Sequence, residues 1–80
     1  MPKLRVLSGK DVVKILSLSG FLIYSQKGSH VKMKRETNNE TQILVIPNHG
    51  KLKKGMLKAL FNQASKYITE EELRPHFYTN

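Results

Sequence analysis

The segment Lys27-Gly28-Ser29-His30-Val31-Lys32-Met33-Lys34-Arg35 predicts a tight turn that leads directly into a basic strand. Successive side chains of a strand point to opposite faces, so His30, Lys32 and Lys34 share one face. Val31 and Met33 share the other face and can pack into a core. The stretch therefore predicts a sheet with one buried face and one open face, and the open face carries a titratable imidazole among ammonium groups.

The segments on either side extend this strand into a sheet. Residues 21–26 and 42–46 are rich in aromatic and branched side chains, which favour strands. Gly28 can take the positive φ that a two-residue hairpin loop requires. Residues 36–40 are polar and predict a second, longer turn, and Pro47 ends the last strand. We expect three antiparallel strands, with the middle one over residues 29–35.

Helical patterns flank these strands. Ser8 and Asp11 form a capping box for a helix over residues 9–19. An apolar stripe predicts a second helix over 53–66, and Thr69 caps a short last helix that Pro75 limits. The sequence predicts one α+β domain over residues 1–80, with the order α-β-β-β-α-α and the helices on one face of a three-stranded antiparallel sheet.

The composition narrows the classes of partner. Residues 27–58 hold eight lysines or arginines against two glutamates, a net charge of +6 out of the formal +8. Such clustering suits a polyanion, first nucleic acid and second an acidic protein, although a plain basic surface stays open. The chain has no cysteine, which excludes disulfides and thiolate sites and suits a reducing cytoplasm. We expect no signal peptide and no membrane span.

His30 is the candidate catalytic residue. RNA supplies its own nucleophile, the 2′-hydroxyl, so a ribonuclease needs only a base, an acid and groups that stabilise charge. Lys27, Lys32 and Lys34 can stabilise that charge, but a solvent-exposed histidine without a role is the alternative. The three histidines lie far apart and form no known metal motif, so we expect no metal site.

A second basic cluster lies at the predicted start of the second helix. Lysines there add charge to the positive end of the helix dipole, which suits phosphate binding, although a solvated face would look the same. His49 lies in the loop before it, either as a loop stabiliser or as a second acid. The lysines assigned to RNA binding in this cluster are Lys51, Lys53, Lys54 and Lys58.

Six short sequence elements follow one another along nearly the whole chain, and each has little specificity when taken alone. They are Ser8–Leu16, Gly20-Phe21, Lys27-Gly28-Ser29-His30, Ile46-Pro47-Asn48-His49, Lys54–Leu60 and Thr69–Leu73. Together they resemble the HicA family of toxins, the small RNA-cleaving halves of toxin–antitoxin pairs. Met56 stands where the family usually has threonine, and a single glycine follows His49 where the family often has two.

The resemblance implies a double-stranded-RNA-binding-like α-β-β-β-α fold, cleavage of mRNA without the ribosome, and inhibition by a HicB-like antitoxin. The catalytic histidine of the family falls on His30, and Gly28 and Ser29 belong to the same element. The missing glycine leaves the role of His49 open. Two other functions share the charge pattern: a non-catalytic double-stranded nucleic-acid-binding module and a domain that only docks an acidic protein.

Overall fold

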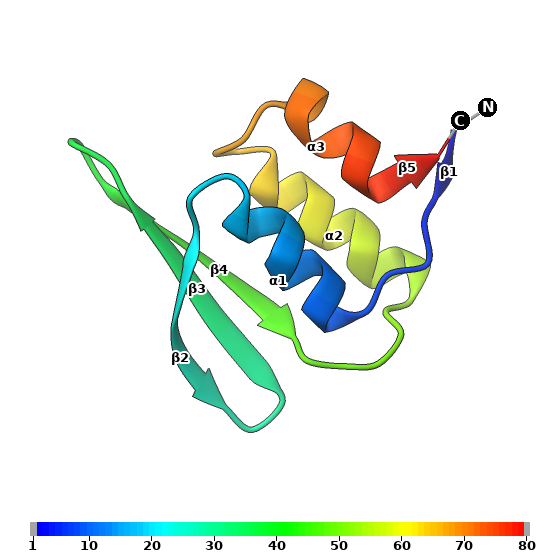
Figure 1. Cartoon of the computed structure of the whole chain (residues 1–80), viewed down its shortest axis with the longest axis horizontal. Coiled ribbons are helices and arrows are strands. Elements are labelled where there is room, and N and C mark those ends of the chain that lie inside the picture. The colour runs from blue at the N-terminus through cyan, green and yellow to red at the C-terminus, as the bar shows by residue number, and fades with distance from the viewer. Residues whose placement is uncertain (1, 80) are drawn as a thin grey trace.

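The elements follow one another in the predicted α-β-β-β-α-α order, with a short strand added at each end. In the computed structural model, which describes residues 2–79, these residues form helices and two antiparallel sheets (Figure 1). The predicted bounds of the domain, residues 1 and 80, lie outside the described residues. The elements are β1 (Lys3–Leu4), α1 (Gly9–Ser17), β2 (Leu22–Lys27), β3 (His30–Glu36), β4 (Thr41–Pro47), α2 (Lys54–Ala64), α3 (Glu70–Phe77) and β5 (Tyr78–Thr79).

The larger sheet has the order β2-β3-β4, and its middle strand alternates between a core face and an open face. Val31 and Met33 are 4% and 0% exposed, and they lie opposite Ile46 and Leu44 of β4, which are also buried. The helices lie together on the side of these four residues (Figure 1). This arrangement confirms the predicted α+β class with helices on one face of a three-stranded antiparallel sheet.

The start of α1 is fixed to the end of β4. The Ser8 hydroxyl accepts from the Asp11 backbone N–H at 3.1 Å, and the Ser8 N–H donates to the Asp11 carboxylate at 2.9 Å, which confirms the predicted capping box. The Gly9 N–H donates to the His49 carbonyl oxygen at 2.8 Å. A Cβ on Gly9 would collide with the Pro47 carbonyl oxygen, so only glycine allows this close approach.

Several predicted boundaries are shifted by one or two residues: α1 ends at Ser17 and not at residue 19, and α2 covers Lys54–Ala64 and not 53–66. Two further differences have a clear physical reason. The β2–β3 turn consists of Gly28 and Ser29, because Lys27 pairs directly with His30, so Ser29 lies in the turn and not in the strand. Gly28 has φ +59°, as the first central residue of a type II′ turn requires. Pro75 lies inside α3, which continues to Phe77. A proline costs one helical hydrogen bond, and the complete burial of Phe77 favours the continued helix.

The chain ends pair with each other, which the sequence pattern did not predict. Lys3 lies opposite Thr79 and Leu4 opposite Tyr78 in a two-stranded sheet. The Arg5 N–H donates to the Phe77 carbonyl oxygen at 2.8 Å and extends the connection. Two-residue strands are too short to give a periodic signal, and their partners lie at opposite ends of the sequence.

Candidate active site and nucleic-acid interface

Three segments hold His30 at the edge of the open face. His30 is the first residue of β3, and it lies opposite Lys27 of β2 and Pro47 of β4. The Asn48 N–H donates to the Ser29 carbonyl oxygen at 2.6 Å, which attaches the loop after β4 to the β2–β3 turn. The His30 side chain is exposed. The imidazole therefore lies at an accessible position whose backbone is fixed on both sides.

The lysines of the open face lie at different distances from His30. Lys27 is its cross-strand neighbour, so their Cβ atoms are about 5 Å apart. Lys32 follows two residues along β3, a rise of about 7 Å, and Lys34 follows four residues along, about 13 Å. Lys34 is also engaged elsewhere: its Nζ lies 3.3 Å from the Glu36 carboxylate and 5.4 Å from the centre of the Tyr24 ring. Lys27 and Lys32 are thus the cations best placed beside the imidazole.

Apolar side chains are interleaved with these lysines, and sequence reasoning missed them. Leu22 and Ile43 flank Lys34 in the register and are 69% and 47% exposed, and Val45 beside Lys32 is 38% exposed. A group of exposed apolar side chains on one face of a small protein indicates a contact with another molecule more often than does a single exposed residue. The alternating pattern of β4 contained the signal, since Ile43 and Val45 fall on the face opposite Leu44 and Ile46.

Arg35 belongs to the core side of β3 and is not part of the open face. Its Nε donates to Gln42 Oε1 at 2.8 Å, and its two Nη atoms donate to the carbonyl oxygens of Ser19 at 2.9 Å and Tyr67 at 2.8 Å. The guanidinium also lies 4.9 Å from the centre of the Phe21 ring. One of the eight cations counted in the basic segment is thus structural.

The second basic cluster surrounds the N-terminus of α2, as its lysines were expected to do. Lys53 is the N-cap and makes no side-chain capping bond, and the first turn has no acidic residue. The positive end of the helix dipole is therefore reinforced. Lys54 and Lys58 line a cavity of about 520 Å³ together with Lys3 and Tyr78. Lys3 is an addition that only the β1–β5 pairing supplies, while Lys51 is exposed in the loop before the helix.

The loop that contains His49 connects the two basic regions. It leaves β4 beside His30, and its backbone bonds to the segment before α1: Gly9 N–H to the His49 oxygen, and Leu52 N–H to the Leu7 oxygen at 2.9 Å. The His49 backbone thus has a structural role, while its side chain is exposed. A polyanion that follows this loop would pass from His30 to the lysines of α2.

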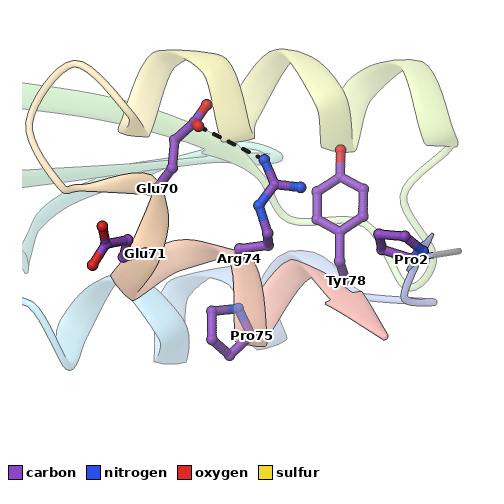
Figure 2. A pocket seen from close by; sticks show the side chains of 6 residues that line it. All are labelled: Pro2, Glu70, Glu71, Arg74, Pro75 and Tyr78. Atoms are coloured by element: carbon purple, nitrogen blue, oxygen red, sulfur yellow. Dashed lines mark ion pairs between the residues drawn. The ribbon is translucent and has the colours of Figure 1, made fainter. Parts of the chain in front are cut away.

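A separate cavity of about 400 Å³ lies over α3 and is unsuited to an anion. Figure 2 shows its lining side chains, with Glu70 and Arg74 pointing toward each other and the Tyr78 ring beside Arg74. The Arg74 guanidinium lies 3.7 Å from the Glu70 carboxylate, and Glu71 adds another negative charge. The one arginine of this cavity is already paired, so a phosphate would meet a net repulsion there.

Within its described residues, the structure contains neither a group of metal ligands nor a membrane-spanning helix. Among residues 2–79, no three His, Asp or Glu side chains form a group that could hold a metal ion. In the same range, no helix is both long enough and apolar enough to cross a membrane.

Comparison with known protein families shows which family the chain matches. The model of the HicA toxin of bacterial toxin–antitoxin systems matches residues 9–65, from the first residue of α1 to just beyond α2. The chain belongs to the HicA toxin family. It is accordingly the toxin of a toxin–antitoxin pair, with an antitoxin as its partner. A search among curated proteins returned no match.

The matched range separates the three-stranded sheet and its basic residues from the two ends of the chain. It includes the whole β2-β3-β4 sheet, His30 and both basic clusters of this HicA toxin. It leaves out β1, α3 and β5, and with them Lys3 and the acidic cavity over α3. The elements beyond the family match are thus those that join the two ends of the chain.

Proposed function

We propose that this HicA toxin is a metal-independent endoribonuclease that cleaves mRNA, with His30 as the catalytic acid or base. The observation that carries the proposal is the exposed imidazole at the first residue of β3, opposite Lys27 and beside Lys32. The family membership supports a toxin, and the charged open face supports RNA as its target.

The reaction uses the nucleophile that RNA supplies. His30 takes the proton of a ribose 2′-hydroxyl, and the 2′-oxygen forms a bond to the adjacent phosphorus. The bond from phosphorus to the 5′-oxygen breaks, and that oxygen takes up a proton. The products are a 2′,3′-cyclic phosphate and a 5′-hydroxyl. Lys27 and Lys32 stabilise the extra negative charge on the phosphorus centre, because a fixed cation acts most strongly where charge develops.

The remaining candidate residues hold the substrate. Gly28 and Ser29 form the turn, where the lack of a side chain at Gly28 lets a phosphate backbone approach closely. Flanking phosphates bind to the more distant cations, since cations fix the position of a nucleic acid mainly through its phosphates. These cations are Lys34, Lys51, Lys53, Lys54 and Lys58.

The experiment is cleavage of single-stranded RNA by the purified toxin in the presence of a chelator. We expect fragments that end in a 2′,3′-cyclic phosphate and a 5′-hydroxyl. The matched control is the same RNA with 2′-O-methyl groups, which lacks the nucleophile and should stay intact. If the RNA stays intact in both reactions although the protein binds it tightly, the protein is instead a non-catalytic nucleic-acid-binding module. Fragments that end in 3′-hydroxyl groups would exclude the 2′-hydroxyl mechanism.

The antitoxin inhibits, in this proposal, by covering the open face of the sheet. Its carboxylates pair with Lys27 and Lys32, and its apolar side chains cover Ile43 and Val45, whose exposure an RNA does not require. Val45→Lys should therefore weaken inhibition while it leaves RNA cleavage by the free toxin in place. Unchanged inhibition of the Val45→Lys and Ile43→Lys variants would place the antitoxin on another surface.

A further inference from the structure

A groove between α1 and β2 lies on the helix side of the sheet, at the end of β3 where His30 lies on the opposite face, and the proposed reaction does not use it. Its volume is about 270 Å³, below the roughly 300–1,000 Å³ of pockets that hold drug-sized ligands. The apolar part of its lining comes from Val13 of α1, Ile23 of β2 and Val31 of β3. A cavity of this size with apolar walls suits one flat heteroaromatic ring.

Two side-chain amides add hydrogen-bonding capacity to this groove. Gln26 and Asn48 both line it, the first exposed and the second half-buried. The amide of Gln42, in contrast, is buried and committed to structure, since it accepts from Arg35 and donates to Glu40 at 2.8 Å each. A side-chain amide offers a donor and an acceptor together, which matches the edge of a nucleobase.

Lysines form the helical side of the same groove. Lys10 and Lys14 are exposed and lie one turn apart on α1, so they share one face of the helix. Neither belongs to the basic segment that the sequence singled out. Ammonium groups beside an apolar slot with amides suit a nucleotide, whose base would occupy the slot and whose phosphate would lie at the lysines.

The walls of the groove are built on the segments that position His30. Gln26 lies opposite Val31, directly beside the pair of Lys27 and His30. The backbone N–H of Asn48 donates to the Ser29 carbonyl oxygen at 2.6 Å. A strand of RNA that leaves a base in the groove can pass to the open face over Gly28, where an added Cβ would meet no described atom within 4 Å.

We propose that this groove binds the nucleobase next to the scissile phosphate, and that Gln26 and Asn48 set the base preference of cleavage. The inference rests on the proposed ribonuclease function and deepens it: the substrate is single-stranded RNA, because the base edge must be free to enter the groove. The helix side of β2 then selects the site, while the open face of β3 performs the reaction.

The test is the pattern of cleavage sites in an RNA pool of random sequence. For Gln26→Ala and Asn48→Ala we expect a weaker preference at one position beside the cleaved bond, with a loss of about 5- to 150-fold at preferred sites. Poorly cleaved sites should change little, since they do not use the amides. The matched control is Gln63→Ala, which removes an exposed amide on α2 outside the groove. A preference unchanged in both groove variants, or changed equally by Gln63→Ala, would overturn the inference.

A binding measurement separates this inference from the ribonuclease proposal. RNA oligonucleotides that contain one 2-aminopurine are bound to the His30→Ala protein, in which cleavage should be slower by about 10²- to 10⁴-fold. We expect a fluorescence change for one position of the probe, and its loss in a His30→Ala, Ile23→Glu double variant, because the charge enters the apolar slot. Ile23 is 52% exposed, so this change leaves the core intact. A change that survives Ile23→Glu would overturn the groove even if the wild-type protein cleaves RNA.

Discussion

The two faces of β3 differ in what they contribute. On the core face, Val31 and Met33 are buried and Arg35 donates hydrogen bonds to three acceptors. On the open face, His30 and Lys32 contact little and are exposed. A single strand thus supplies stability from alternate residues and chemistry from the residues between them. Substitutions that separate these contributions test the whole account.

The largest effect on stability is expected from the core face. Met33→Ala removes a completely buried side chain in the middle of the sheet, which should lower the free energy of unfolding by about 2–5 kcal/mol. Lys32→Ala, one residue away on the open face, should change it by less than about 0.5 kcal/mol. Urea denaturation of both proteins measures the difference. Equal losses of unfolding free energy in the two variants would contradict the assignment of stability to the core face and of chemistry to the open face.

Arg35 provides the next test, because its charge alone would assign it to RNA. Arg35→Met should cost about 2–3 kcal/mol, since the carbonyl oxygens of Ser19 and Tyr67 lose their donor. The matched control is Lys34→Met, which removes a cation from the open face and should cost much less. Denaturation of the two variants gives the comparison. A larger loss of stability for Lys34→Met would contradict the structural assignment of Arg35.

The lysines of α2 should show opposite signs for stability and binding. Glutamate in place of Lys53 and Lys54 complements the helix dipole and should raise the free energy of unfolding slightly, by about 0.3–1 kcal/mol for each change. The same double variant should bind single-stranded RNA more weakly. The slope of log affinity against log salt should fall by about 1.4 if two phosphate contacts are lost. An unchanged salt slope would remove these lysines from the RNA footprint.

The smallest effect concerns the cap of α1. Hydrogen bonds from the Ser8 backbone N–H and then its hydroxyl lower the pKa of Asp11 below its ordinary value. A carboxylate whose pKa is lower in the folded state stabilises the fold above its unfolded pKa, and this stability is lost as pH falls through the folded pKa. The difference in stability between wild type and Asp11→Asn should therefore be full at neutral pH and shrink below about pH 4. Urea denaturation of both proteins at neutral pH and below about pH 4 measures this difference in stability. A difference that grows as the pH falls would contradict the capping hydrogen bonds.

Local patterns predicted most of the fold. The alternation in residues 30–36 and 41–47 determines which face is buried, and the capping box of Ser8 and Asp11 identifies the start of α1. The wrong predictions at Ser29 and Pro75 concern single residues whose state depends on pairing or packing with distant segments. The β1–β5 pair was not predicted for the same reason, because two-residue strands contain no local periodic pattern.

The candidate site could be predicted only in its charged part. A lysine-rich strand with one histidine is visible in the sequence, whereas the groove of Gln26 and Asn48 needs β2 and the loop after β4 to meet around Val31. Arg35 shows the opposite limit of prediction from sequence, because its charge suggests RNA binding but its role is structural. Its positive charge is visible in the sequence, but its three carbonyl and amide acceptors come from Ser19, Gln42 and Tyr67, which only the fold brings together.

The rate of RNA cleavage by His30→Ala, measured at saturating protein, tests the central claim most directly. Removal of a general acid or base should lower the rate by about 10²- to 10⁴-fold, while RNA affinity changes little because Lys27 and Lys32 remain. The exposed position of His30 means that the variant should unfold at the same urea concentration as wild type. A folded His30→Ala protein that cleaves RNA at the wild-type rate would contradict the account.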